Sequence, residues 1–425
     1  MTHNPTPLVV RDAAQLVCVA SAGETVRRGT AMRSPLILDR GALIATNGQI
    51  DWIGRTTDLP PIPADALVID ATGKTVLPGL IDSHTHLLFA GTREDEFERR
   101  IEGVTYQEIA ARGGGINATV RRVRTASKDD LKGLARRRLG RLLSFGVTTV
   151  EVKSGYGLTV ADEIKCLEAI AELNAEGPLE LVPTFLGAHA IPPEFASDRD
   201  GYLRLLTDEM LPEVARRRLA EFCDVFCETG VFSVTESEHL LRCAVRFGLR
   251  LKVHADELTP LGGAELAARL GAASADHLLC ITDAGIDALA ASDTVATLLP
   301  GTAFFLGVPY APARRLIERG LAVALASDCN PGTCPTENLP LVGAMACTQM
   351  KMLPGEALTA LTLNAAAALR RADRIGSLAP GKQADLIVCE IPDYRQLFYH
   401  YGVSHVSRVI KRGRVVYTAG AGAAA

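Results

Sequence analysis

The sequence has no strong charge imbalance and no long apolar run. Its 425 residues carry 45 Lys and Arg against 49 Asp and Glu, which gives a net charge of −4. Such a balance is not typical of proteins that bind nucleic acid or membrane surfaces. No segment reaches the ~20 apolar residues that a membrane-spanning helix needs, and the apolar patch near the start is too interrupted for a signal peptide. We therefore expect a cytoplasmic protein whose partner is neither nucleic acid nor a membrane.

The sequence also lacks a dense cysteine framework. Its ten cysteines are spread along the chain, unlike the closely spaced cysteines of small secreted domains. Cys223 and Cys227 lie in an apolar run and are predicted to pack in the core. Cys329 and Cys334 flank a loop of the site predicted below, where packing is favoured and reactivity is the alternative.

The chain does contain β-rich segments of two kinds. Residues 36–70 and the stretch after 378 alternate short β-rich runs with turns, and Asn47-Gly48 is typical of a hairpin. They predict a small β-sandwich domain from residues 1–70 and 378–425. Between them, apolar runs alternate with helix-like stretches, which predicts a (β/α)8 barrel of the α/β class over residues 71–377. The eight runs are 75–86, 147–157, 179–190, 223–230, 250–258, 274–279, 294–300 and 322–330.

Polar residues stand near the ends of these runs, where barrel enzymes carry their catalytic groups. His84 and His86 are two apart, so on a strand both rings point to one side and can bind one ion. His254 and Asp328 follow two other runs and complete a predicted set of metal ligands. Imidazole nitrogen and carboxylate oxygen suit zinc or iron. We expect one such divalent or trivalent ion, which would make hydroxide available near neutral pH.

Other polar residues near these ends have predicted roles with an alternative. Glu257, three residues after His254, is placed to move a proton, and His277 is placed to polarise the carbonyl under attack. An exposed loop carboxylate and a satisfied buried imidazole are the respective alternatives. Lys153 either bears a carbamate that bridges two metals or, as we favour, hydrogen-bonds into its loop. The GGGI segment at 113–116 lacks the context of a phosphate loop and is interpreted as a flexible lid.

With these residues in place, the motifs PGLIDSHTH, HADE, SADH, ASD and GKQADLIV resemble the amidohydrolase superfamily in its mononuclear form. More narrowly, EVKSGYGL, TFLGAHAIPPEF and SDCNPGT are similar to segments of the imidazolonepropionase family, in the same order, from about residue 40 to the C-terminus. The resemblance implies hydrolysis of 4-imidazolone-5-propanoate to N-formimidoyl-L-glutamate, the third step of histidine degradation. It also implies a homodimer.

The resemblance assigns roles to individual residues. It implies that His84, His86, His254 and Asp328 hold the metal and that Glu257, His277 and Asp328 carry the catalysis. It places substrate contacts on Arg93, Tyr156, His189, Glu257 and Thr333, and product contacts on Tyr156, Asn330 and Gly332. The guanidinium of Arg93 suits an anionic propionate, although a carboxylate in its own segment, TREDEFERR, is an alternative partner.

Two other functions compete with this hypothesis. An aminohydrolase that acts on a purine or pyrimidine would release ammonia from the same metal site; the segments around Arg93 and Tyr156 argue against it. A non-catalytic scaffold would typically have lost metal ligands and would be purified without metal, whereas this chain keeps every one.

Overall fold

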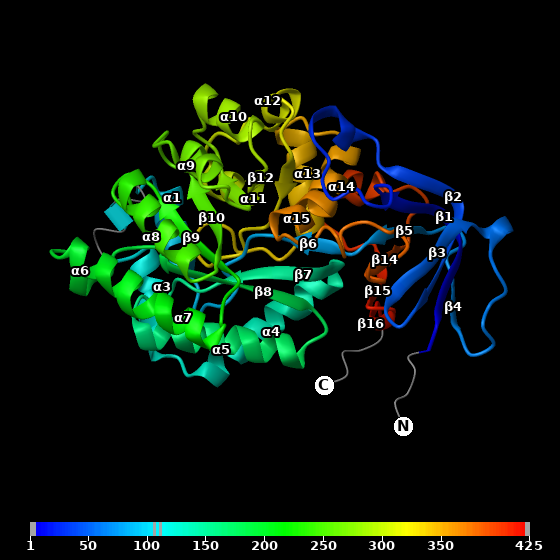
Figure 1. The fold of residues 1–425 in the computed structure, drawn as a ribbon, viewed down its shortest axis with the longest axis horizontal. Helices are drawn as coiled ribbons and strands as arrows, with labels where there is room; N and C mark the ends of the chain where they lie inside the picture. Colours follow the sequence, from blue (N-terminus) through cyan, green and yellow to red (C-terminus); the bar gives the residue numbers. More distant parts are fainter. Residues whose placement is uncertain (1–5, 105–107, 110–112, 421–425) are drawn as a thin grey trace.

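Two sheets, one parallel and one mostly antiparallel, form the framework of the molecule (Figure 1). The structure is a computed structural model and describes residues 6–104, 108–109 and 113–420. The middle of the chain builds the parallel sheet with its helices, and both chain ends contribute to the second sheet. The predicted fold, a β/α barrel with a small β-sandwich domain, is confirmed. Residues 1–5 and 421–425, which the predicted small domain includes, lie outside the described residues.

Eight parallel strands follow one another around the barrel, each paired with the next in chain order. They are β6 (Leu80–Asp82), β7 (Val147–Lys153), β8 (Glu180–Ala188), β9 (Phe222–Cys227), β10 (Arg250–Ala255), β11 (Ser274–His277), β12 (Val295–Leu298) and β13 (Val323–Leu325). Almost all of their residues are buried, as expected for strands covered on both faces. Backbone beyond the first and last strands completes the ring, because Asp328 N donates to His84 O at 3.0 Å and His86 N donates to Cys329 O at 3.0 Å.

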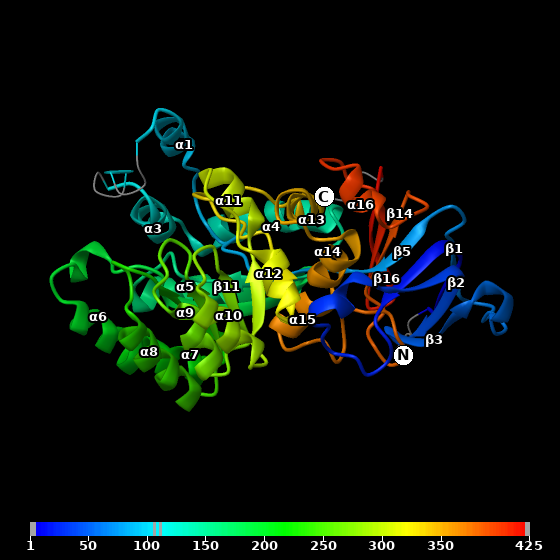
Figure 2. The same ribbon diagram turned by 90° about the horizontal axis from the view of Figure 1, so that it is seen from above.

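Helices cover the outside of the barrel (Figures 1 and 2). Local sequence sets where they begin: Ser127 and Asp130 form a capping box at the start of α4, and Thr159 caps α5. The helices are α1 (Glu94–Ile101), α3 (Ile116–Thr125), α4 (Lys128–Ser144), α5 (Val160–Glu176), α6 (Arg199–Arg204), α7 (Leu211–Arg217), α8 (Val234–Arg246), α9 (Gly263–Arg269), α10 (Asp283–Ala290), α11 (Pro300–Leu306), α12 (Ala313–Glu318), α13 (Leu339–Gln349), α14 (Pro354–Leu361), α15 (Leu363–Ala368) and α16 (Gln396–Tyr399). Within the described ranges, none of them combines the length and the apolar character that crossing a bilayer requires.

The second sheet joins the two ends of the chain. Its strands are β1 (Leu8–Val19), β2 (Leu36–Thr46), β3 (Gln49–Arg55), β4 (Leu67–Asp70), β5 (Thr75–Pro78), β14 (Leu386–Cys389), β15 (Val406–Lys411) and β16 (Arg414–Thr418). They run in the order β16-β15-β14-β5-β1-β2-β3, with β4 beside β1. The predicted hairpin is confirmed, since Asn47 and Gly48 turn β2 into β3 with φ values of 52° and 81°. Leu16, Leu43 and Leu386 belong to a small core of its own.

The first predicted barrel run, 75–86, is split between the two sheets. Its first part, β5, pairs with β1 and β14 in the terminal sheet, and only β6 enters the barrel. His84 and His86 therefore lie beyond the end of β6 rather than on a strand, which corrects the sequence-based interpretation. β5 and β14 are more than 300 residues apart in the chain, so the local pattern of this run does not reveal that they pair. The predicted domain boundary at residue 71 stays a prediction.

Candidate active site

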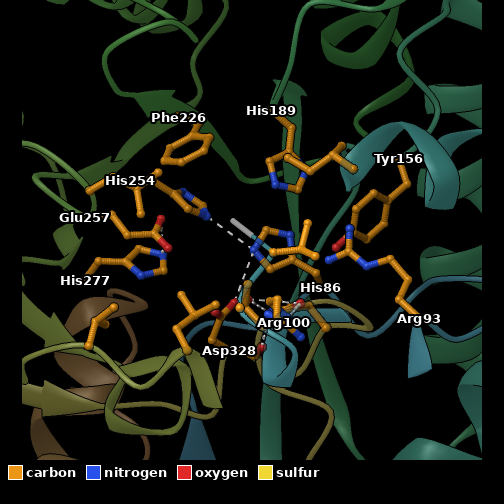
Figure 3. A pocket seen from close by; sticks show the side chains of 18 residues that line it. His86, Arg93, Arg100, Tyr156, His189, Phe226, His254, Glu257, His277 and Asp328 are labelled. Atoms are coloured by element: carbon orange, nitrogen blue, oxygen red, sulfur yellow. Dashed lines mark hydrogen bonds and ion pairs between the residues drawn. The ribbon is translucent and has the colours of Figure 1, made fainter. Parts of the chain in front are cut away.

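The four predicted metal ligands come together at the carboxyl ends of the barrel strands, and Figure 3 shows three of them, His86, His254 and Asp328, around one point. His84 Nε2 lies 3.3 Å from His86 Nε2, which in turn lies 3.2 Å from His254 Nε2. Asp328 Oδ1 is 3.6 Å from His84 Nε2 and 3.5 Å from His86 Nε2. All four side chains are buried. Segments after β6, at the end of β10 and after β13 thus present three nitrogens and one carboxylate to one point.

The chemistry of this set fits a cation. His84 Nδ1 lies 2.6 Å from Asp276 Oδ2, and His254 Nδ1 lies 3.0 Å from Asp224 Oδ2. The carboxylate of Asp276 only accepts hydrogen bonds, so the His84 ring proton belongs on Nδ1 and its lone pair on Nε2. The contact of His254 Nδ1 with Asp224 is close but is not aligned as a hydrogen bond. Converging lone pairs repel each other unless a cation lies between them. Ligands at ~2.0–2.1 Å around a tetrahedral ion would be ~3.3 Å apart, close to the observed nitrogen separations.

Burial keeps the imidazoles of His84, His86 and His277 neutral, the form that metal ligation requires of His84 and His86. Burial is the largest cause that lowers the pKa of His84, His86 and His277 well below the usual range. It also raises the pKa of Asp328 to about 6, against a hydrogen bond from Thr302 Oγ1 to Asp328 Oδ2 at 2.6 Å. Neutral rings and a desolvated carboxylate gain from binding a cation, because the cation supplies the missing positive charge.

The strand ends carry backbone strain at the functional positions. Asp328 and His277 have left-handed φ values of 56° and 78°, which side chains with a Cβ rarely adopt. Asn330 supports the turn after Asp328: its Nδ2 donates to Asp328 O at 2.7 Å, and its Oδ1 accepts from Gly332 N and Thr333 N, both at 2.8 Å. The loop that was expected to contact ligand therefore also fixes the direction of Asp328.

Glu257 and His277 lie side by side in the wall of the same pocket. Glu257 Oε2 lies 3.5 Å from His277 Nε2, and the Glu257 side chain is only 10% exposed. Burial, then Asp328 and Glu228, raise the pKa of Glu257 well above the usual range. The alternative of an exposed loop carboxylate is therefore wrong. Neither ring nitrogen of His277 has a hydrogen-bond partner among the residues that the structure describes, so the alternative of a satisfied buried imidazole is wrong as well.

A cavity of about 560 Å³ opens from the ligand set toward solvent. His189 stacks on His86 with ring centroids 4.8 Å apart and an angle of 19° between the rings. Tyr156 lies next to His189, at 5.2 Å between centroids. The predicted contact residues Arg93, Tyr156, His189, Glu257, Asn330 and Thr333 all line this cavity.

Arg93, at the start of α1, brings a largely unneutralised positive charge into the cavity. Its Nε is 3.6 Å from Glu96 Oε2, a loose ion pair, so the alternative partner in its own segment is present. However, its Nε and Nη1 have no hydrogen-bond partner within the described part of the chain, and Arg93 is 6% exposed. A buried guanidinium with unused donors is unfavourable unless a ligand anion pairs with it.

Gly332 lies directly against this guanidinium. A Cβ built on Gly332 would fall 1.0 Å from Arg93 Nη2. Arg100 Nη2 donates to Gly332 O at 3.0 Å, and Arg100 also lines the cavity. Sequence reasoning missed Arg100; its spacing of seven residues from Arg93, two turns along α1, is a signal that could have found it.

Sequence reasoning also missed the carboxylates behind the ligands. Asp224 contacts His254 and Asp276 contacts His84. Asp224 lies in DVFC, which was interpreted for its cysteines, and Asp276 lies in SADH, which was interpreted for His277. A carboxylate one residue before a strand-end histidine is a weak signal on its own. Asp276, at β11, gains its role because its carboxylate contacts His84, which lies in the segment after β6.

The positions of the side chains settle two of three secondary predictions. Lys153 does not bond into its loop: its Nζ contacts Glu151 Oε1 at 2.6 Å and Asp224 Oδ2 at 2.8 Å inside the barrel. This corrects the favoured interpretation, because Lys153 points inward from the last residue of β7. Cys329 and Cys334 are free and buried, and burial raises the pKa of both thiols, so packing is confirmed over reactivity. Gly115 precedes α3, and the lid role of GGGI stays a prediction.

A parallel β/α barrel with strand-end histidines and an aspartate around one point defines a class of hydrolases that act with a metal ion. The model of the amidohydrolase family matches residues 110–417. The chain is 51% identical to an imidazolonepropionase of Geobacillus kaustophilus, over 97% of this chain and 99% of that protein. It is 49% identical to one of Porphyromonas gingivalis W83, over 98% and 99%. The chain therefore belongs to the amidohydrolase family and, within it, to the imidazolonepropionase family.

A solved structure supports the fold. The crystal structure of an adenosine deaminase from Xanthomonas campestris with bound zinc aligns with a TM-score of 0.72, covering 97% of this chain and 93% of that one. The identity is 19%, so this likeness concerns the fold alone.

Proposed function

We propose that this chain opens the ring of 4-imidazolone-5-propanoate with water and yields N-formimidoyl-L-glutamate, in the third step of histidine degradation. Relatives named imidazolonepropionase are about half identical to it over nearly the whole length of both chains. The observation that carries the proposal beyond a general hydrolase is Arg93, whose guanidinium has unused donors in the same cavity as the metal-ligand set. A small ring with an acidic tail matches both features.

His84, His86, His254 and Asp328 would hold the ion. When bound, it supplies a Lewis acid that makes water nucleophilic near neutral pH. The chain's own residues then move the protons. Glu257 accepts a proton from the attacking water as the oxygen bonds to the ring carbonyl carbon. It returns that proton to the ring nitrogen as the carbon–nitrogen bond breaks.

The remaining residues position the substrate. His277 lies beside Glu257 and is placed to polarise the carbonyl oxygen. Arg93 pairs with the propionate, while Tyr156 and His189 contact the heterocycle. The turn built by Asn330 lies at the wall of the cavity, and we assign it contacts with the product through Asn330 and Gly332 and with the substrate through Thr333.

Purified protein with metal present should consume the imidazolone, followed by the loss of its ultraviolet absorbance, and should release no ammonia. Absence of turnover with metal bound would overturn the assigned substrate but not the family. Release of ammonia from guanine or cytosine would instead support the aminohydrolase alternative. A metal-free protein after purification without chelators would point to a scaffold.

We further propose one zinc or iron ion per chain, a homodimer, and a location in the cytoplasm. Imidazole and carboxylate ligands suit either metal. Elemental analysis of the purified protein identifies the ion, and sedimentation equilibrium gives the mass of the assembly.

A further inference from the structure

A cluster of five buried charged groups lies inside the barrel, next to the histidine ligands. It consists of Glu151, Lys153, Asp224, Lys252 and Asp276, and the side chains of all five have no exposed surface. Burying so many charges is unfavourable unless they pair closely. The site chemistry proposed above uses neither the Lys153 nor the Lys252 ammonium group, so their presence there is unexplained.

Lys153 makes the shortest contacts in this cluster. Its Nζ is 2.6 Å from Glu151 Oε1 and 2.8 Å from Asp224 Oδ2. The same oxygen, Asp224 Oδ2, faces His254 Nδ1 at 3.0 Å. Glu151 is fixed in turn by Thr184, whose Oγ1 donates to Glu151 Oε1 at 2.5 Å. A chain of contacts therefore runs from β8 through Glu151 and Lys153 to the carboxylate that orients one metal ligand.

Lys153 is also tied to the other ligands through its backbone. Lys153 N donates to Thr85 O at 3.0 Å, and Thr85 lies between His84 and His86. Thr85 Oγ1 donates to Glu151 O at 2.6 Å. The last residues of β7 thus hold the segment with two ligands through their own backbone N–H and C=O groups, and contact the third ligand through the Lys153 side chain and Asp224.

Lys252 differs from Lys153 although it is equally buried. Its Nζ donates to Ser83 O at 2.8 Å and lies 3.7 Å from Asp276 Oδ2 and 3.8 Å from Glu151 Oε1. It contributes the same charge to the same cluster, with looser contacts to the carboxylates. Lys252 is therefore a matched control for the effect of charge.

We propose that Lys153 is a positioning residue of the metal site, whose ammonium holds Asp224 against His254 and so fixes the ring with Nε2 toward the ion. The inference rests on the metal-dependent function proposed above. Without Lys153, Asp224 Oδ2 loses its closest partner, and the hydrogen bond from Val225 N to Asp224 Oδ1 at 2.7 Å holds only the other oxygen of the carboxylate. Oδ2 is then less constrained to face His254, which allows the His254 ring to change tautomer or rotate. Although burial opposes the charge of Lys153, Asp224, Glu151 and Asp276 raise its pKa, so the ammonium is retained.

Simple electrostatics predicts the opposite effect on the metal. Removing a positive charge near a cation site should strengthen cation binding, because the remaining cluster is more negative. Loss of a residue that orients a ligand should weaken binding, typically by about 10- to 100-fold. The sign of the change in affinity therefore distinguishes positioning from neutralisation.

The test compares the wild type with Lys153→Met and Lys252→Met. Zinc affinity is measured by competition with a chromophoric chelator, and the tautomer of His254 by proton–nitrogen correlation spectra of the metal-free protein. We expect Lys153→Met to weaken zinc binding about 10- to 100-fold and to change the His254 signals. Lys252→Met should leave the His254 signals in place. Unchanged or tighter zinc binding in Lys153→Met, or equal effects of both variants on His254, would overturn the proposal.

Folding and function are controlled separately. Circular dichroism shows whether Lys153→Met folds. If it does not, the double variant Glu151→Gln with Lys153→Met removes one charge of each sign and is expected to show the same loss of zinc affinity. Retained zinc affinity in the double variant would also overturn the proposal. If the wild type itself binds no metal, the proposed function fails. If the wild type binds metal and turns over substrate, and the Lys153 variants bind metal with normal affinity, only the inference about Lys153 fails.

Discussion

Replacement of Gly332 by alanine tests whether Arg93 binds the acidic tail. The added Cβ would lie 1.0 Å from Arg93 Nη2 and 2.1 Å from its Cζ, whereas ordinary contacts are near 3.5 Å. The guanidinium must therefore move by roughly 2 Å or more. Gly332 does not have a left-handed φ, so alanine adds no backbone strain and the effect comes from this contact alone.

The expected loss follows from the strength of a charged hydrogen-bonded pair. Hydrogen bonds to charged groups contribute about 1.5–3 kcal/mol each. Displacing a two-pronged arginine contact should thus lower kcat/KM by ~10²- to ~10⁴-fold, for a loss of about 3–6 kcal/mol. The propionate does not react, so its contact stabilises ground and transition states alike, and the change should appear in KM rather than in kcat.

The assay is steady-state loss of imidazolone absorbance for Gly332→Ala, Arg93→Met and the double variant. If alanine acts only through the guanidinium, Gly332→Ala should cost little more once Arg93 is gone. Gly140→Ala is the matched control, since a Cβ there meets nothing within 4 Å, and its KM should equal that of the wild type. A KM for Gly332→Ala within twofold of the wild type, or additive effects in the double variant, would refute the reasoning.

Three further predictions follow from single features of the site and the fold. Glu257→Gln should keep its metal, by elemental analysis, yet lose ~10²-fold or more in kcat; near-normal turnover would exclude the proton-transfer role. Removal of metal by a chelator should lower the melting temperature and abolish turnover, since the lone pairs of the ligands then repel, and added zinc or iron(II) should restore both; an unchanged melting curve would contradict the fit of this site to a cation. Burial lowers the pKa of Lys382 from 10.5 to about 8, so the unfolded chain binds more protons between these values and this group's contribution to stability rises from pH 8 to 10.5. Denaturant unfolding should show that rise in the wild type relative to Lys382→Met; parallel curves would refute it.

Most of the barrel strands could be predicted from local sequence patterns. Each strand is buried on both faces, so apolar residues dominate it, and all eight runs were found from this pattern. The ligands were predictable for a related reason. Side chains at the carboxyl ends of barrel strands must meet at one face, so His254 and Asp328 could be placed together without coordinates.

Features that depend on pairing between distant segments were less predictable. β5 looks like the start of a barrel strand, but its partners, β1 and β14, lie in the terminal sheet. Lys153 was expected to hydrogen-bond into its loop. Its burial is acceptable because it pairs with Glu151 on the same strand and with the carboxylates of Asp224 in β9 and Asp276 in β11, and the last two are brought close only by the barrel.

The sequence by itself determined the fold class, the candidate ligand set and, through its motifs, the family, because these depend on the order and spacing of residues along the chain. The tertiary structure alone decided which atoms orient the ligands and which space the substrate can occupy. Asp224 and Asp276 gain their roles by approaching His254 and His84, and Gly332 gains its role by leaving room for Arg93. Such contacts join residues far apart in the chain at distances of 3 Å or less, which no local pattern records.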